Sequence, residues 1–193
     1  HKRVALAVSI LTFVASLALI TKFNGDTFHF QLVEFMPWIK SLGINYQIGV
    51  DGISYWLILL TTFLSIIATW FSFYVDKRVK LYFICLLILE TAMLGVFVSL
   101  DMILFYTFFE ASLVPMWLLI SIWGGERRTY AGLKFFIYTF AGSIFMLIGI
   151  ITLANLYAGT ANGQLSFSII DIQHAVANGS LWAKAMYLQP WIF

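Results

Sequence analysis

Five long apolar runs limit what this chain can fold into. They lie at about residues 4–21, 53–75, 81–100, 102–123 and 129–157, and few of their residues are charged. A helix of about 20 apolar residues spans the roughly 30 Å hydrocarbon core of a bilayer, because each residue adds about 1.5 Å. We therefore predict an all-α integral membrane protein, a polytopic bundle of about five transmembrane helices in one domain.

The composition agrees with this class and argues against others. Hydrophobic residues make up 62% of the 193 residues and charged residues only 10%, more apolar surface than a soluble domain needs. A net charge of +2 gives no reason to expect a nucleic-acid partner. The sequence has one cysteine, Cys85, no Gly-rich phosphate loop and no Cys/His cluster, so we expect no cofactor and no metal on this chain.

Two segments between the runs are long for connections in a bundle. Residues 22–52 contain an alternation of apolar and polar residues over 44–50, which predicts a strand or hairpin on the outer surface. Residues 158–190 are mostly polar, with a short amphipathic stretch over 168–177. We expect both segments to lie on the same side of the membrane as outer loops.

The basic residues are distributed unevenly between the two sides. One side collects Lys2, Arg3, Lys77, Arg78, Lys80, Arg127 and Arg128, and the other has Lys22, Lys40 and Lys184. The positive-inside rule predicts that the first set is cytoplasmic. The chain begins without methionine and ends in the opening of another apolar segment, so we expect it to be an internal piece of a longer protein.

Glu110 lies near the middle of the run at 102–123. Ionisable groups at that depth are expensive and usually functional. Tyr106 and Thr107, one turn earlier on the same helical face, offer hydroxyls to it. The pattern predicts a carboxyl group that gains and loses a proton; the structural alternative is a static hydrogen bond between helices.

Two further charged residues, Glu90 and Lys134, lie inside apolar runs. Glu90 precedes the turn at 99–101 by about ten residues and Glu110 follows it by about ten, so the two carboxyl groups should lie at similar depth. If they also face each other, each raises the proton affinity of the other. Lys134 lies about 9 Å inside its end of the helix, where it modulates Glu110, relays a proton or extends to the interface.

These residues and their neighbours carry a family resemblance. YTFFEASLVPMWLLISIWGG at 106–125, followed by AGLKFFIYTFAGS at 131–143, resembles the antiporter-like membrane subunits of respiratory complex I, and the M type in particular. The upstream LGINYQIGVDGIS at 42–54 and GVFVSLDMILFY at 95–106 fit the same pattern. The resemblance covers about residues 4–157.

The resemblance implies a function and roles for three residues. Glu110 would be the essential glutamate of the family and Lys134 its nearby lysine, whereas Glu90 matches a glutamate that only some members carry. It further implies a translocase subunit of a bacterial plasma membrane NADH:quinone oxidoreductase, with FMN, iron–sulfur clusters and quinone on other subunits and no redox site on this chain. Its partners would be lipid and the neighbouring antiporter-like subunits.

Two other functions remain open from the sequence. One is a subunit of a multi-subunit cation/proton antiporter or of a membrane-bound hydrogenase, which share the glutamate and lysine pattern. The other is a purely structural membrane subunit, in which the buried charges only fix the packing of the helices.

Overall fold

The computed structural model describes residues 1–24, 29–160 and 164–181. Its five long helices are α1 (Lys2–Lys22), α2 (Gly52–Phe71), α3 (Val79–Val98), α4 (Met102–Trp123) and α5 (Arg128–Ala158). All five are long and apolar enough to cross a membrane, α2 together with the 3-10 turn Ser72–Tyr74 that continues it. The prediction of a multi-pass helical bundle is confirmed.

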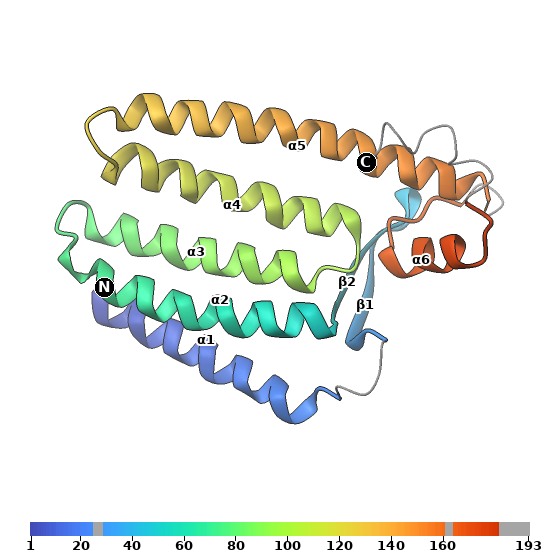
Figure 1. Cartoon of the computed structure of the whole chain (residues 1–193), viewed down its shortest axis with the longest axis horizontal. Coiled ribbons are helices and arrows are strands. Elements are labelled where there is room, and N and C mark those ends of the chain that lie inside the picture. Colours follow the sequence, from blue (N-terminus) through green and yellow to red (C-terminus); the bar gives the residue numbers. More distant parts are fainter. Residues whose placement is uncertain (25–28, 161–163, 182–193) are drawn as a thin grey trace.

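The long helices lie beside one another in chain order (Figure 1). Short turns connect α2 to α3, α3 to α4 and α4 to α5, so successive helices run antiparallel. Helix α1 contacts α3 as well as α2, which makes the first three helices a compact group. Helix α5 packs mainly on α4 and runs past its end (Figure 1).

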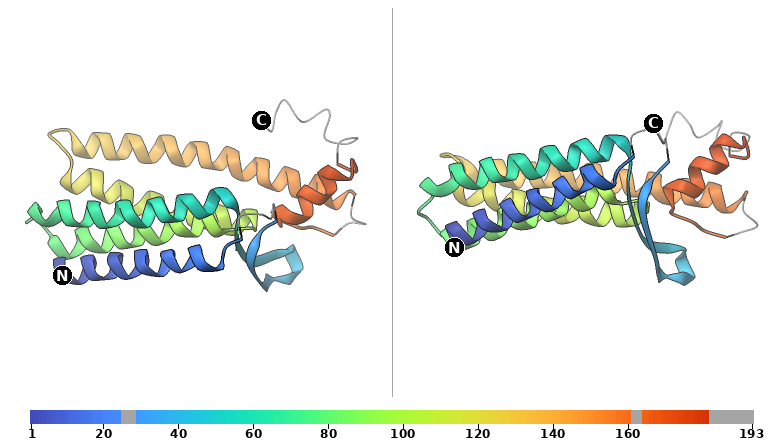
Figure 2. Two further views of the ribbon diagram at one scale, coloured as in Figure 1. Left: turned by 60° about the horizontal axis from the view of Figure 1, so that its bottom comes forward. Right: turned by 90° about the horizontal axis from the view of Figure 1, so that it is seen from below.

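A β-hairpin projects from one end of the bundle (Figure 2). Strands β1 (Gln31–Ile39) and β2 (Ile44–Val50) pair antiparallel, which confirms the predicted hairpin. Gly43 closes the turn with a φ of 69°, and a Cβ there would clash with the carbonyl oxygen of Leu165. Both the backbone conformation and the close approach therefore require glycine at this position.

The same end carries the short helix α6 (Ile169–Ala177), within the predicted outer loop 158–190 (Figure 1). The Ser168 side chain accepts a hydrogen bond from the Asp171 N–H and so caps the helix. We call this end of the molecule the hairpin end. Residues 161–163 and 182–190 of that loop, including Lys184, lie outside the described residues, as do residues 25–28 of the loop 22–52.

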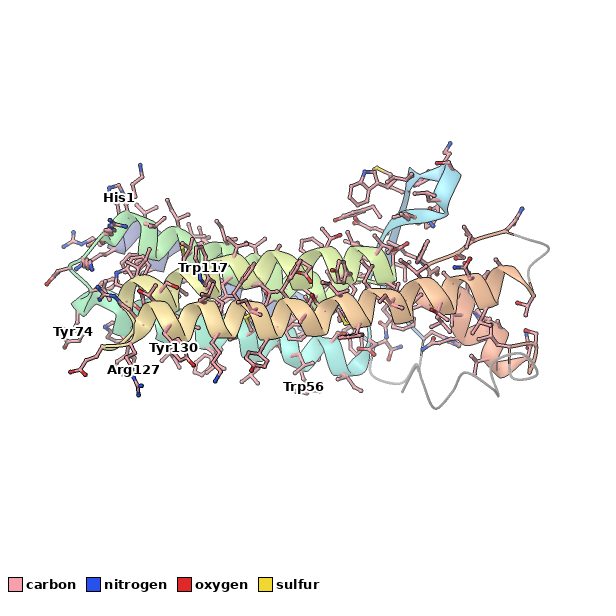
Figure 3. The ribbon with its side chains drawn as sticks, turned by 90° about the horizontal axis from the view of Figure 1, so that it is seen from above. His1, Trp56, Tyr74, Trp117, Arg127 and Tyr130 are labelled. Carbon is pink, nitrogen blue, oxygen red and sulfur yellow. The ribbon has the colours of Figure 1, made fainter. Side chains whose placement is uncertain are left out.

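The opposite end, which we call the basic end, collects the chain start and the loops at 75–78 and 124–127. His1, Tyr74, Arg127 and Tyr130 lie toward this end, and Trp56 lies toward the hairpin end (Figure 3). The Lys2 amine contacts the Asp76 carboxylate at 3.2 Å, and the Trp123 indole N–H donates to the Lys77 carbonyl at 2.7 Å. These contacts join the start of α1 and the end of α4 to the same loop.

The turn between α3 and α4 is clamped at the hairpin end. The Leu100 N–H donates to the Gln47 carbonyl of β2 at 2.8 Å, and the Met102 N–H donates to the Phe167 carbonyl at 2.9 Å. The Ile169 N–H in turn donates to the Leu100 carbonyl at 2.9 Å. The turn therefore has backbone partners on two sides, which fixes how α3 and α4 enter the bundle.

Asp101 is the centre of this clamp and is fully buried. Its Oδ2 accepts from the Asn45 N–H at 2.9 Å, and its Oδ1 accepts from the N–H groups of Ile103 and Leu104 at 2.9 and 3.2 Å. Burial raises the pKa of Asp101, although the three backbone N–H donors act in the opposite direction. One side chain thus caps α4 and ties it to the hairpin.

Candidate functional site

Glu110 lies about 13 Å along α4 from Asp101, near the middle of the helix. Its Oε1 is buried and has no hydrogen-bond partner among the described residues. The Tyr106 side chain, one turn earlier, interacts with Glu110 and with Ser143 of α5. Ser143 is itself buried in the bundle. The carboxyl group is therefore associated with the contact between α4 and α5.

Thr107 does not serve Glu110 as predicted. Its hydroxyl donates to the carbonyl of Ile103 on its own helix, at 2.8 Å, and the residue is exposed. A threonine in a helix commonly satisfies its hydroxyl in this way. Of the two hydroxyls predicted for Glu110, the structure brings only that of Tyr106 to it.

Glu90 of α3 lies in a different environment. The side chain is buried, and the Ser9 hydroxyl of α1 donates to its Oε2 at 3.2 Å. The hydroxyls of Ser9 and Thr69 of α2 lie 3.4 Å apart. The other carboxyl oxygen, Oε1, is buried and unpartnered within the described ranges. Glu90 thus belongs to the group formed by α1, α2 and α3.

The two glutamates are not joined to each other. Helical geometry puts them at similar depth, because they lie nearly the same number of residues from the turn at 99–101. Among the residues the structure describes, however, no hydrogen bond connects Glu90 with Glu110, and their polar neighbours belong to different helices. The sequence predicted the depth of the pair; the structure assigns each carboxyl group its own surroundings.

Lys134 is exposed on α5, with its amine 5.8 Å from the ring centroids of both Tyr130 and Tyr138. Tyr130 marks this part of α5 in Figure 3. Gly132 faces α4, since a Cβ there would clash with the Ser121 hydroxyl. Two residues further on, Lys134 points about 200° around the helix and so away from α4. Within the described part of the chain the structure does not bring Lys134 to Glu110.

The sequence reasoning missed four hydroxyl residues of the first two helices. Ser9 and Ser16 of α1 meet Thr69 and Thr62 of α2, and all four are buried. The Ser16 and Thr62 hydroxyls lie 2.9 Å apart. Ser9 and Ser16 lie seven residues apart on α1, and Thr62 and Thr69 lie seven residues apart on α2. This spacing places the two hydroxyl residues of each helix on one face. That spacing was the available signal, and it indicates a polar seam between α1 and α2.

The described residues contain no group of three or more His, Cys, Asp or Glu side chains that could hold a metal ion. Away from their ends, the long helices instead carry two carboxyl groups, the amine of Lys134 and several hydroxyls. Such groups can bind, hold and pass on protons. The candidate site is therefore a set of ionisable and hydroxyl side chains distributed over the helical bundle.

Residues 99–193 match the family described as NADH:quinone oxidoreductase/Mrp antiporter, TM. The NADH-quinone oxidoreductase subunit M of Rhodobacter capsulatus is 45% identical over 174 residues, which cover 90% of this chain and 33% of that protein. The chain thus spans about a third of the length of this curated relative.

Solved structures show the same fold. A chain of respiratory complex I from Thermus thermophilus with bound NADH matches with a TM-score of 0.76 and 27% identity, over 89% of this chain and 34% of that chain. A chain of the Mrp complex from a Dietzia species matches with a TM-score of 0.68 and 16% identity, over 85% of this chain and 17% of that chain.

Together, the bundle, the intramembrane carboxyl groups and these matches define the class of protein. The chain belongs to the antiporter-like membrane subunits of the NADH:quinone oxidoreductase/Mrp antiporter family. Within that family it is similar to subunit M of NADH-quinone oxidoreductase. The resemblance read from the sequence is confirmed.

Proposed function

We propose that the chain is part of a proton-translocating membrane subunit of an NADH:quinone oxidoreductase, in which Glu110 takes up and releases a proton. The observation that carries the proposal is the buried Oε1 of Glu110, which has no hydrogen-bond partner among the described residues, next to Tyr106. Its subunit M relatives support the assignment to this complex. Quinone reduction in other subunits would supply the free energy.

Electrostatics explains how such a carboxyl group can be driven. In apolar surroundings a carboxyl group is neutral unless a cation lies close, because burial penalises the charged form. The described residues around Glu110 provide hydroxyls and no paired cation. A positive charge that moves toward Glu110 therefore releases its proton, and withdrawal of that charge allows the proton to be taken up again.

Lys134 is the candidate that the sequence offers for a positive charge of this kind. Its amine lies on the face of α5 that points away from α4, between two tyrosine rings. In the proposal it acts on Glu110 through space or through further groups that cover this face of α5. Glu90, at similar depth in the neighbouring helix group, is the third proton-transfer residue.

The surroundings of the subunit follow from the same proposal. The basic end faces the cytoplasm of a bacterial plasma membrane, by the positive-inside rule. The other antiporter-like subunits and lipid are the partners. FMN, iron–sulfur clusters and quinone are bound elsewhere in the complex, and the chain itself performs no redox step and binds no nucleic acid.

The decisive experiment is Glu110→Gln in the full-length protein, assembled in its complex and reconstituted in vesicles. We expect NADH-driven proton uptake to fall about 100-fold, as for loss of an acid–base group, while the complex still assembles. Glu126→Gln is the matched control, because Glu126 is an exposed glutamate in the loop between α4 and α5. Wild-type proton uptake in Glu110→Gln would contradict the proposal.

The fold match to the Mrp complex supports a second candidate, a subunit of a cation/proton antiporter. The full-length protein, tagged and purified in mild detergent, separates the two. Copurifying flavin and iron–sulfur absorbance with NADH oxidation supports the first function. A flavin-free assembly that exchanges cations for protons in vesicles supports the second. A purely structural subunit would instead show impaired assembly in Glu110→Gln with unchanged turnover per assembled complex.

A further inference from the structure

Glu90 has a specific connection to the first helix that the proposed function does not use. Ser9 is fully buried, and its hydroxyl donates to Glu90 Oε2 at 3.2 Å. Because the single proton of Ser9 is used in this bond, Thr69 is the donor across the 3.4 Å between the Thr69 and Ser9 hydroxyls. The three side chains, from three different helices, form one directed chain of hydrogen bonds that ends on the carboxyl group.

The second carboxyl oxygen of Glu90, Oε1, indicates which ligand Glu90, Ser9 and Thr69 can bind. Glu90 Oε1 is buried without a hydrogen-bond partner among the described residues, and no ion pair reaches the carboxyl group there. A buried charged carboxyl group without a cation is costly, whereas a neutral one needs only one donor and one acceptor. A proton is therefore the ligand that fits this site.

The titratable groups on the elements packed around Glu90 are few. Helix α1 carries Lys2, Arg3 and Lys22 only at its ends, and α2 carries Tyr55 near the hairpin end. The strand β2 contributes Tyr46. The remaining groups are the following: Lys80, Tyr82 and Cys85 on α3 itself, and Tyr106 and Glu110 on α4. Glu110 interacts with Tyr106, and Tyr106 interacts with Ser143 on α5, so Glu110 and Tyr106 belong to the other carboxyl site.

We propose that Glu90, Ser9 and Thr69 form a second proton-binding site, separate from Glu110, in which the Ser9 hydroxyl positions the carboxyl group and sets its proton affinity. The contribution of this site to transport rests on the proposed function, but its binding of a proton does not. Ser9 and Thr69 are positioning residues, because they act on the proton through Glu90.

A groove between α2 and α3 makes the site testable by chemistry. It has a volume of about 370 Å³ and is lined by leucines together with Thr69 and Glu90. Dicyclohexylcarbodiimide, an apolar reagent, can enter such a groove. Its central carbon bonds to the carboxyl oxygen while the carboxyl proton moves to nitrogen, so only the protonated acid reacts. Mass spectrometry of peptides then reports the labelled fraction of each glutamate separately.

The experiment measures labelling of Glu90 and Glu110 against pH in membranes that hold the full-length protein. We expect Ser9→Ala to move the midpoint of Glu90 labelling upward by about one pH unit, because a lost donor to a charged group favours the protonated acid. The midpoint of Glu110 should stay in place. Thr69→Val, which weakens Ser9 as a donor without touching Glu90, should give a smaller shift in the same direction.

Ser16→Ala is the matched control. Ser16 is a second buried serine of α1, seven residues from Ser9. Its hydroxyl lies 2.9 Å from that of Thr62, and among the described residues it contacts no carboxyl group. It should shift neither midpoint. The proposal is overturned if Glu90 is not labelled at any pH, if neither Ser9→Ala nor Thr69→Val shifts its midpoint, or if Ser16→Ala shifts it equally.

The two proposals can fail separately. Normal pumping in Glu110→Gln together with the expected Glu90 labelling would contradict the proposed function and leave the second site standing. Loss of pumping in Glu110→Gln, with no shift of the Glu90 midpoint in Ser9→Ala or in Thr69→Val, would contradict the second site alone.

Discussion

Two carboxyl groups at similar depth in this bundle have different relations to the helices around them. Glu90 accepts a hydrogen bond from α1 and is nearly enclosed, with 6% of its surface exposed. Glu110 is only half-buried and interacts with Tyr106 and, through it, with α5. The first group lies in a three-helix cluster, whereas the second lies beside the helix whose outer face is least covered by the described residues.

The difference indicates which group can respond to events elsewhere. The proton affinity of a buried acid follows its immediate donors and charges. Around Glu90 these are fixed hydroxyls of neighbouring helices, so its affinity is set locally. Glu110 is linked through Tyr106 to Ser143 of α5, the helix that also carries Lys134, so in the proposed function a change around α5 reaches Glu110.

The largest expected effect compares the two glutamates directly in NADH-driven proton uptake by vesicles. Glu110→Gln should reduce uptake about 100-fold, and Glu90→Gln should reduce it only in part, because only Glu110 is coupled to α5. The comparison requires equal amounts of assembled complex in both variants. Equal losses of uptake would show that the two carboxyl groups act as one unit.

The next effect concerns the clamp that holds both glutamate helices. Asp101→Ala removes the acceptor of three backbone N–H groups, and we expect it to lower the free energy of unfolding by about 3 kcal/mol. Asp51→Ala, which removes one cap bond from Ser54 on α2, should cost about 1 kcal/mol. Unfolding of the purified full-length protein in mixed detergent measures both. Similar losses of unfolding free energy in Asp101→Ala and Asp51→Ala would show that the hydrogen bond from Asn45 to Asp101 does not stabilise the fold.

A third change separates the two sites by packing. In Gly132→Ala the new Cβ would clash with Ser121 and push α5 away from α4. We expect the free energy of unfolding to fall by about 1–3 kcal/mol. Carbodiimide should label Glu110 faster, whereas the labelling of Glu90 should stay unchanged. Gly142→Ala is the control on the same helix, because its Cβ meets no atom within 4 Å. Faster labelling of Glu90 in Gly132→Ala would mean that the two environments are connected.

The smallest effect is a pH dependence at the turn between the sites. Burial raises the pKa of Asp101 above its ordinary value, so the folded protein binds this proton more tightly than the unfolded one. The resulting stability is complete below the ordinary aspartate value of about 3.9 and is lost as the pH rises through the raised value. Asp101→Asn should lack this decline in a thermal denaturation series. A rise in stability with pH over the same range would show that the backbone donors outweigh burial in setting the pKa of Asp101.

The sequence predicted the elements of the fold well, for a physical reason. A run such as Met102–Trp123 must be helical in lipid, since its backbone has no other partner, and Ile44–Val50 alternates with the period of a strand. Glu110 and Glu90 were recognisable because each is a charge inside such a run. Their depth followed from counting residues to the turn at 99–101.

The neighbours of these groups could not be predicted in the same way. A helix that is apolar all round does not reveal which face meets which partner, so the contact of Glu90 with Ser9 was not foreseen. The prediction that Thr107 offers its hydroxyl to Glu110 was wrong, because that hydroxyl donates to the Ile103 carbonyl of the same helix. The direction of Lys134 depends on the close approach of α5 to α4 at Gly132, which needs the packed structure.

The length of α5 has a mechanical consequence. Its 31 residues form one uninterrupted helix of about 46 Å, longer than the hydrocarbon layer, and it runs past α4 toward α6 (Figure 1). A rod of that length is a lever: a tilt of about 10° about one end displaces the other by about 8 Å. If α5 tilts about its start at the basic end, a small displacement at Lys134, about 9 Å from that start, becomes about fivefold larger at the hairpin end.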